Sequence, residues 1–307
     1  MNLQQLRYLC TIASHDLNVS SAARALHTSQ PGVSKQIRLL EEELGIDLLV
    51  RRGNRIVALT APGQSALGIA ARMIQDAANL RALGKEFTEG NSGQLVVAAT
   101  SVHSRYWLLP AVVQFTKRYP DVHLKLLRGT PTQVVGMVES GEAQIGICTP
   151  PHQTIADLLL LPCHEIQRAV IAPLGHALLR KRRITLEDIS LYPLIIQTAE
   201  SSGGWTVLQA FEARGLKPQL VHDIVDAEMA KACVEQHIGI TVLPSRVFDK
   251  KRDKNIRAID ASHLFAPLVI HAVIHKNTYL RDYAHDFIQL FAPRWNRVAV
   301  EKAVRQR

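Results

Sequence analysis

Cysteine is scarce in this chain and is not arranged for a metal site. The 307 residues include only four cysteines, which lie far apart: Cys10, Cys148, Cys163 and Cys233. No two have the short spacing of zinc ligands, so we expect no metal and no structural disulfides. We expect buried thiols instead. Cys148 is the exception, because it would end a strand beside the pocket predicted below and be partly accessible, which keeps redox sensing as a minor hypothesis.

Long hydrophobic runs and an export signal are also missing. No stretch is apolar over the roughly 20 residues that a membrane-spanning helix needs. The first residues, Met1-Asn-Leu-Gln-Gln-Leu6, lack a charged start, an apolar stretch and a small-residue cleavage site. We therefore expect a cytoplasmic protein without a membrane partner.

Signatures of the common enzyme classes are absent. The chain has no Gly-x-Ser-x-Gly elbow, phosphate-binding loop or dinucleotide fingerprint, and His164-Glu165 lacks a second histidine one helical turn later. We therefore predict that the protein is not an enzyme and has no catalytic residues and no cofactor. The net charge of +9 favours a polyanionic partner, although charge alone also produces nonspecific association.

What the chain does contain is a helix with two distinct faces near its N-terminus. Val33, Ile37, Leu40 and Leu44 fall at intervals of four, three and four residues and therefore share one face, which we assign to a small core. The opposite face is polar and basic, as a helix lying in the major groove of DNA requires. This pattern makes regulation of transcription the leading hypothesis.

The start of this helix carries the predicted base contacts. Ser29 suits the N-cap and Pro31 the first turn, so Gln30 lies where recognition helices meet base edges. Glutamine can bond adenine through two atoms, and we predict Gln30 as the first base reader. The predicted DNA-binding residues of the helix are Ser29, Gln30, Pro31, Ser34, Lys35 and Arg38.

Two shorter helices are expected to brace this one. The first is predicted to bury a stripe formed by Leu3, Leu6, Cys10 and Ala13. Ser20 is the expected cap of the second, in which Ala22 and Ala23 are small enough for close crossing.

A basic hairpin is predicted after the two-faced helix. Gly45 should end that helix, and residues 46–59 then supply two short apolar stretches around a basic turn. We predict a wing whose arginines lie over phosphates, namely Arg51, Arg52 and Arg55. The alternatives are a solvated hairpin and, for the whole segment, a helix bundle that binds only proteins.

A long helix is expected next. Thr60 suits its N-cap, and Pro62 its first turn. Apolar residues then recur at helical spacing, which predicts a narrow seam for a partner helix. The seam residues are Leu67, Ala70, Ile74 and Ala77, continued after a small phase shift by Leu80, Leu83 and Phe87. The alternative is a helix packed on its own domain.

The pattern changes after a polar, glycine-containing break at residues 90–93. Predicted strands at 94–100, 122–128 and 145–149 alternate with predicted helices at 106–119 and 132–142. Such alternation implies an α/β domain with a mainly parallel sheet, in which ligands lie beyond the carboxyl ends of the strands. The chain crosses near residues 162–163 into a second alternating unit and returns near 266–268, so we expect two lobes around a cleft.

Hydroxyl groups gather at the predicted strand ends. Residues 100–104 end one strand and lead into a helix, whose first N–H groups favour an anion, and Thr149 ends another strand. In the second lobe, residues 195–198 end a strand and residues 201–204 open a helix. We predict an anion pocket here. The alternative is that these hydroxyls only cap helices.

Several segments together carry a family resemblance. They include Leu26-His-Thr-Ser-Gln-Pro-Gly-Val-Ser-Lys-Gln-Ile-Arg-Leu-Leu-Glu41, Leu59-Thr-Ala-Pro-Gly63, Gly129-Thr-Pro-Thr-Gln133 and Asp286-Phe-Ile-Gln-Leu-Phe-Ala-Pro293. The chain resembles the LysR-type transcriptional regulators and, within them, the CysB-like and Cbl-like regulators of sulfur assimilation. The resemblance implies an α/β protein overall, with an N-terminal winged helix-turn-helix (1–59), a linker helix for dimerisation (60–90) and a two-lobed, periplasmic-binding-protein-like effector domain (91–307). Lobe I would span about 91–162 and 267–295, and lobe II about 163–266.

The CysB-like resemblance also implies which residues face the cleft. They are Thr100, Ser101, Val102, His103, Thr132, Gln133, Thr149, Ile166 and Ser202. This chain departs from the subgroup at Val102 and His103, where the subgroup has threonine and glutamine, and at Ile166, where it has tryptophan. The pocket is therefore more apolar and gains an imidazole, unless His103 is a loop histidine without a role. The expected effector is a small anion, either sulfate, thiosulfate, a sulfonate or an O-acetylserine-like compound.

The family resemblance implies the partners as well. They are double-stranded promoter DNA, RNA polymerase and further copies of the chain, in a homotetramer built as a dimer of dimers. One alternative is a LysR-type regulator of aromatic or amino-acid metabolism that responds to a small carboxylate. A remote one is a transporter's solute-binding protein, which the absent export signal and the DNA-binding unit oppose. The basic residues 294–307 are predicted to form a surface helix.

Overall fold

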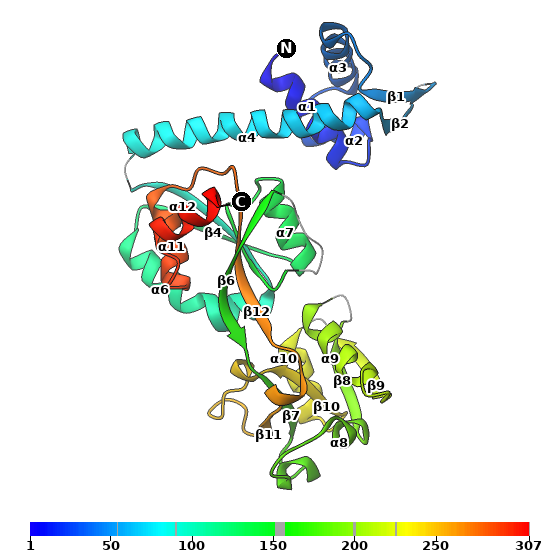
Figure 1. Cartoon of the computed structure of the whole chain (residues 1–307), viewed down its shortest axis with the longest axis vertical. Coiled ribbons are helices and arrows are strands. Elements are labelled where there is room, and N and C mark those ends of the chain that lie inside the picture. The colour runs from blue at the N-terminus through cyan, green and yellow to red at the C-terminus, as the bar shows by residue number, and fades with distance from the viewer. Residues whose placement is uncertain (54, 90, 151–156, 199–200, 225, 307) are drawn as a thin grey trace. The chain divides into compact units, whose positions relative to one another are not determined.

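The computed structural model of the protein describes residues 1–53, 55–89, 91–150, 157–198, 201–224 and 226–306 (Figure 1). The chain forms two compact units, one of Met1–Thr88 with Asn277–Tyr279 and one of Glu89–Lys276 with Leu280–Arg307. Gly90, where a domain boundary was predicted, and the wing residue Asn54 lie outside the described residues. Within the described ranges, no helix is both long and apolar enough to cross a membrane.

The first unit is a winged helix-turn-helix followed by a long helix. Its elements are α1 (Leu3–Ser14), α2 (Val19–Ala25), α3 (Gln30–Leu44), β1 (Leu49–Arg52), β2 (Arg55–Leu59) and α4 (Ala61–Glu89). Strands β1 and β2 pair antiparallel and form the wing. The predicted fold is confirmed. Ser29 is the N-cap of α3, and Gly45 ends it in the left-handed conformation, with a φ of 69°.

The buried face of α1 differs from the predicted stripe. Leu6, Leu9 and Ile12 are buried, whereas Leu3 is 38% exposed and Cys10 is only half-buried. The apolar residues of α1 allow stripes in more than one phase, and the contacts of α1 with α2 and α3 select the one centred on Leu9. The stripe predicted through Leu3 and Cys10 is therefore wrong in phase.

Two helix ends also differ from the prediction. Asn18, not Ser20, caps α2, since its side chain accepts a hydrogen bond from the Ser21 N–H at 2.9 Å. Both residue types are good caps, so the choice depends on where the chain leaves the extended conformation. Leu44 was assigned to the core but is 42% exposed, because α3 ends at this residue and turns away at Gly45.

The first half of α4 packs on its own unit. Ala70 is buried in the core of the winged unit, and Leu67 and Ile74 pack against the same core. The seam predicted through these residues is therefore an internal contact over this part of the helix. The last three residues of the predicted seam are exposed instead, together with two apolar side chains outside it: Leu80, Leu83 and Phe87, with Ile69 and Met73. We call this set the exposed stripe of α4.

The second unit contains two five-stranded sheets. The first has the order β4-β3-β5-β12-β6 and the second β11-β7-β10-β8-β9. The strands of the first sheet are β3 (Gly93–Ala99), β4 (Val122–Arg128), β5 (Ile145–Cys148), β6 (Leu158–Ile166) and β12 (Leu268–His275). The strands of the second are β7 (Arg168–Pro173), β8 (Pro193–Gln197), β9 (Gln219–Ile224), β10 (Ile240–Pro244) and β11 (Ile256–Asp260).

Both sheets are mixed rather than mainly parallel. In the first sheet, β3 runs parallel to β4 and β5, but β12 runs antiparallel to β5 and β6. In the second, β8 runs parallel to β9 and β10, but β7 runs antiparallel to β10 and β11. Most of the antiparallel pairs join strands that are far apart in the sequence. The local alternation of helices and strands does not reveal such pairs.

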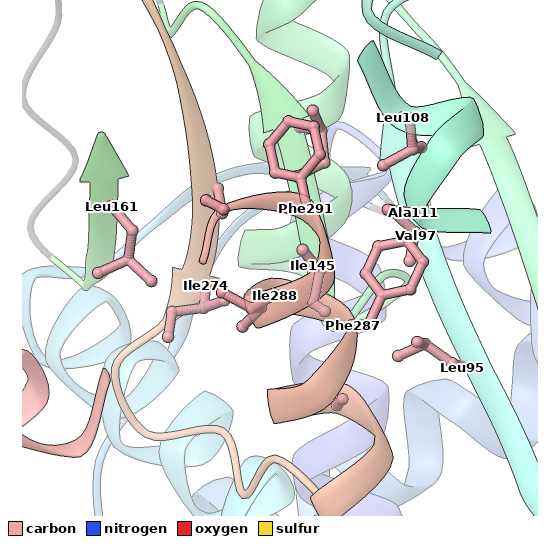
Figure 2. Close-up of a cluster of buried hydrophobic side chains, with 14 of the residues drawn as sticks. Leu95, Val97, Leu108, Ala111, Ile145, Leu161, Ile274, Phe287, Ile288 and Phe291 are labelled. Atoms are coloured by element: carbon pink, nitrogen blue, oxygen red, sulfur yellow. The ribbon is translucent and has the colours of Figure 1, made fainter. Parts of the chain in front are cut away.

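Helices cover both sheets. Around the first lie α5 (Ser101–His103), the π-helical turn η1 (Ser104–Leu108), α6 (Leu109–Arg118), α7 (Pro131–Glu139), α11 (Asp282–Phe291) and α12 (Arg297–Arg305). Around the second lie α8 (Leu186–Ser190), α9 (Ser202–Glu212) and α10 (Ala227–Glu235). Figure 2 shows Phe287 and Phe291 of α11 gathered with sheet residues such as Ile145 in the core of the first lobe. Helix α12 confirms the surface helix predicted in the basic tail, with Val300 buried beneath it.

Two connections join the lobes. Strand β6 leads through Gln167 into β7, and β12 returns the chain to the first sheet (Figure 1). The two connections lie side by side, because Ile166 at the end of β6 pairs with Leu268 at the start of β12. The carboxyl ends of β3 and β5 and the N-terminus of α9 therefore lie near the same crossing point, where a cavity opens.

Candidate functional site

The start of α3 presents the predicted polar face. The Ser29 hydroxyl accepts a hydrogen bond from the Gly32 N–H at 3.2 Å, which fixes the first turn. Gln30, Lys35 and Arg38 are exposed, and Gln30 donates to the Ser34 hydroxyl at 3.0 Å. Pro31 occupies the first turn, where its missing N–H is not needed. Apart from the half-buried Ser34, these side chains are therefore exposed, whereas Val33 and Ile37 are buried.

The wing arginines do not share one environment. Arg52 and Arg55 are exposed, whereas Arg51 forms an ion pair with Glu41, with 2.6 Å between Arg51 Nη2 and Glu41 Oε2. Glu41 is only 7% exposed and also accepts hydrogen bonds from the N–H groups of Leu48 and Leu49, at 2.9 and 3.2 Å. Arg51 therefore anchors the wing to α3. Glu41 was missed from the sequence, although a carboxylate beside the apolar positions of α3 was a visible signal.

The second unit holds a cavity of about 800 Å³ between its lobes. All the residues predicted to face the cleft line it: Thr100, Ser101, Val102, His103, Thr132, Gln133, Thr149, Ile166 and Ser202. Thr198 and Ser201, from the segments predicted to border the pocket, line it as well, and further lining residues that were not predicted include Arg128, Thr130, Arg168 and Leu268. The volume lies within the roughly 300–1,000 Å³ typical of small-molecule sites.

Some of the cavity hydroxyls also cap helices. Thr100 caps α5 by accepting the His103 N–H at 3.4 Å, and Ser201 caps α9 by accepting the Gly204 N–H at 3.0 Å. Ser202 does not act as a cap, and its hydroxyl donates to the Thr149 carbonyl at 3.1 Å. The Thr149 hydroxyl differs from these, because it is buried and has no hydrogen-bond partner within the described residues.

His103 is a buried, neutral histidine. Burial lowers its pKa to about 4, so the imidazole carries no charge near neutral pH. Its Nδ1 lies 2.9 Å from the Thr100 hydroxyl, and the ring also bonds the Ile147 carbonyl. The ionisable imidazole predicted for the pocket therefore adds a hydrogen-bonding group, not a positive charge.

Arg168 is the charged residue that the sequence interpretation missed. Its side chain lines the cavity at the start of β7 and is only 2% exposed. Its guanidinium carbon lies 5.7 Å from the Phe265 ring centre, and within the described ranges its Nε and Nη2 have no hydrogen-bond partner. Burial lowers the pKa of Arg168 to about 10, so it remains protonated at neutral pH. An arginine opening the apolar run Ala169-Val-Ile-Ala172 was the signal in the sequence.

The cysteines are poor candidates for redox chemistry. Cys148 is fully buried, not partly accessible as predicted, because the carboxyl end of β5 is covered by packed neighbours. Burial raises the pKa of the Cys148 thiol to about 12 and that of Cys163 to about 11, so neither forms the reactive thiolate at neutral pH. In the part of the chain that the structure describes, no cluster of residues is suited to hold a metal ion.

Comparison with known proteins places both units in one family. Residues 3–64 match the family described as bacterial regulatory helix-turn-helix protein, lysR family, and residues 88–296 match the LysR substrate binding domain. The chain is 38% identical over 306 residues to the HTH-type transcriptional regulator SsuR of Burkholderia cenocepacia, covering 100% of this chain and 99% of that protein. It is 38% identical over 307 residues to the regulator CysB of Haemophilus influenzae, covering 100% of this chain and 95% of that protein.

A solved structure shares the fold of the second unit. The cofactor-binding domain of the Cbl transcriptional regulator matches with a TM-score of 0.67 and 26% identity, covering 70% of this chain and 94% of that one. The two family matches together extend from residue 3 to residue 296, and the full-length relatives agree with them. The chain therefore belongs to the LysR family of DNA-binding transcriptional regulators, which are not enzymes.

Proposed function

We propose that this regulator binds promoter DNA through α3 and the wing, and that a small anion in the cavity of the second unit controls its activity on genes of sulfur, cysteine or sulfonate metabolism. One observation carries the proposal of anion sensing: Arg168 and Thr149 line one cavity, and both side chains hold buried polar atoms without partners in the described residues. Buried polar groups in native proteins are normally satisfied, so such groups indicate a ligand.

The sulfur assignment rests on the relatives. The CysB-like resemblance seen in the sequence agrees with the similarity to CysB and SsuR over nearly the whole chain. The regulator would work in the cytoplasm, where it meets promoter DNA and RNA polymerase. We further propose a dimer that associates into a tetramer, so that ligand binding between the lobes changes how the subunits pack on DNA.

A second candidate keeps the family but changes the signal. A guanidinium binds a carboxylate as well as a sulfonate, so Arg168 also suits a regulator of aromatic or amino-acid metabolism that senses a small carboxylic acid. A solute-binding protein of a transporter would need the second unit alone, and the winged helix-turn-helix opposes that role.

Anion sensing is tested by thermal unfolding of the full-length protein with sulfate, thiosulfate, O-acetylserine, alkanesulfonates and carboxylates. A ligand that binds only the native state at about 100 times its Kd stabilises it by about 2.7 kcal/mol, so we expect a clear rise in melting temperature for the effector class. A rise with carboxylates alone would favour the second candidate. Equal melting temperatures under all conditions would contradict anion sensing.

DNA recognition is tested by comparing two substitutions. Gln30→Ala should cost about 1–3 kcal/mol at the cognate site and relax base preference, because Gln30 opens α3 and the start of a recognition helix is where base edges are contacted. Arg52→Ala should weaken all duplexes alike and lower the slope of log K against log salt concentration by about one, because Arg52 is an exposed wing cation. Quantitative binding to cognate and scrambled duplexes at several salt concentrations measures both effects. The same loss for both variants on every duplex would contradict this division of roles.

A further inference from the structure

The cavity of the second unit holds one deeply buried positive charge. Arg168 is 2% exposed, and its guanidinium lies over the ring of Phe265. Among the described residues, the other charged side chains that line the cavity are Arg128 and Asp226, which are exposed and opposite in sign. Within this described lining, Arg168 is therefore the buried positive charge. A buried guanidinium without a counter-ion destabilises the empty protein and favours an anion.

The hydroxyl groups of the cavity differ in whether their protons are available. Ser202 donates to the Thr149 carbonyl at 3.1 Å, and Ser201 donates to the Thr198 carbonyl at 2.7 Å. Thr149 has no such partner within the described residues, although its side-chain oxygen is fully buried. The proton of its hydroxyl is therefore not engaged with any group in the described part of the chain.

Thr100 and His103 bond one another. The Thr100 oxygen lies 2.9 Å from Nδ1 of His103 and accepts the His103 backbone N–H at 3.4 Å. Thr100 and His103 therefore satisfy each other at the end of β3, whereas the Thr149 hydroxyl and the Nε and Nη2 atoms of Arg168 have no such partner within the described residues.

The wall around Arg168 is apolar. Ile166 lies two residues before Arg168 and pairs with Leu268, and Pro244 pairs with Arg168 itself across β7 and β10. All three side chains line the cavity. Their apolar surface and the volume of about 800 Å³ leave space for more than a tetrahedral oxyanion.

From these observations, and resting on the proposed function, we infer that Arg168 binds the acidic group of the effector, that Thr149 donates a hydrogen bond to it, and that the effector is an organic monoanion with an apolar body. A sulfonate and a carboxylate share this chemistry. An inorganic dianion would bring a second negative charge to a site with one buried cation and would leave the apolar wall without a contact. Because Ile166, Arg168 and Leu268 belong to both connections between the lobes, the bound anion would stabilise one arrangement of the lobes.

Two substitutions test the roles of these residues without removing packing volume. Arg168→Met keeps an unbranched chain against Phe265, and Thr149→Val replaces a hydroxyl by a methyl group. Both should raise the melting temperature of the ligand-free protein, because each removes a buried polar group without a partner. Both should weaken effector binding, by about 10- to 100-fold, since hydrogen bonds to charged groups are the stronger kind. Arg168→Lys should retain part of the affinity.

The measurement is calorimetric titration and thermal unfolding of the full-length protein with methane-, butane- and hexanesulfonate, hexanoate and sulfate. Arg182→Met is the control and should bind like the wild type, because Arg182 is exposed and does not line the cavity. We expect affinity to rise with chain length and sulfate to bind more weakly than hexanesulfonate or hexanoate. Unchanged affinity in Arg168→Met, or sulfate as the tightest ligand with no effect of chain length, would overturn the inference. Absence of any anion binding to the wild type would instead contradict the proposed function itself.

Discussion

Replacing Glu41 with alanine should destabilise the winged unit by about 2–5 kcal/mol, because the change leaves two buried backbone N–H groups without their acceptor. The carboxylate is 7% exposed and holds Arg51 together with the N–H groups of Leu48 and Leu49. Both of these leucines are buried, so their N–H groups would lose their acceptor in a place that water reaches poorly. Each such group costs about 1–3 kcal/mol.

The effect should be confined to the first unit, and the chain offers a way to see this. Its three tryptophans, Trp107, Trp205 and Trp295, all belong to the second unit, so their fluorescence reports unfolding of that unit alone. Hydrogen exchange of the amides in α3 and β1 reports the first. In Glu41→Ala we expect amide exchange in α3 and β1 to accelerate by roughly 10²- to 10³-fold. The unfolding transition followed by tryptophan fluorescence should not change.

Matched variants identify the cause. Glu42→Ala removes a neighbouring carboxylate that is exposed, and its effect should stay within about 0.5 kcal/mol. Arg51→Met should cost less than Glu41→Ala, because Glu41 would still accept the two backbone N–H groups. The double variant should cost less than the sum of the single ones, since they share one interaction. Strict additivity would show that the pair does not couple the wing to α3.

The residues that could be predicted from the sequence are those whose role follows from local spacing. The N-cap at Ser29, the end of α3 at Gly45 and the start of α4 after Thr60 depend on neighbours within a few positions, and the structure has them as expected. The lining of the cavity by Thr100 and Thr149 follows from the rule that ligands lie at the carboxyl ends of strands. These rules need no knowledge of which elements pack together.

The residues that could not be predicted depend on distant partners. Glu41 acquires its role from Arg51 and the start of β1, and Arg168 from the ring of Phe265 and the crossing of the lobes. A charged residue in an apolar run is visible in the sequence, but whether it is paired, exposed or left for a ligand is decided by the tertiary structure. The same holds for sheet direction, because β12 joins β5 and β6 from more than a hundred residues away.

The phase of the apolar residues in α4 has the largest consequence for assembly. The side chains of Leu67, Ala70 and Ile74 pack on the winged unit, whereas the exposed stripe of α4 lies roughly 100° away around the helix. Two helices that pack along their length share apolar residues at alternating intervals of four and three. The stripe has this spacing, and Asp76 occupies the one position of the series, between Met73 and Leu80, that is not apolar. Leu80 is 70% exposed and Phe87 is 84% exposed, which is unusual for such side chains in a single chain. We propose that this stripe, which includes the second half of the predicted seam but not Leu67, Ala70 and Ile74, holds two copies of the protein together.

Leu80→Glu and Phe87→Glu should therefore abolish the dimer. A carboxylate buried in a helix seam without a partner costs several kcal/mol, so the dissociation constant of the dimer should rise by about 1,000-fold or more for the double variant. Ala78→Glu is the matched control, because Ala78 is exposed on the opposite side of the same helix and the change adds the same charge.

Sedimentation velocity over a range of concentrations measures the association of the two copies, and binding to duplexes with one or two half-sites measures its consequence for DNA binding. We expect the double variant to bind both duplexes equally weakly, since a monomer presents only one recognition helix. If Ala78→Glu dissociates the protein and the double variant does not, the two chains meet through another face of α4.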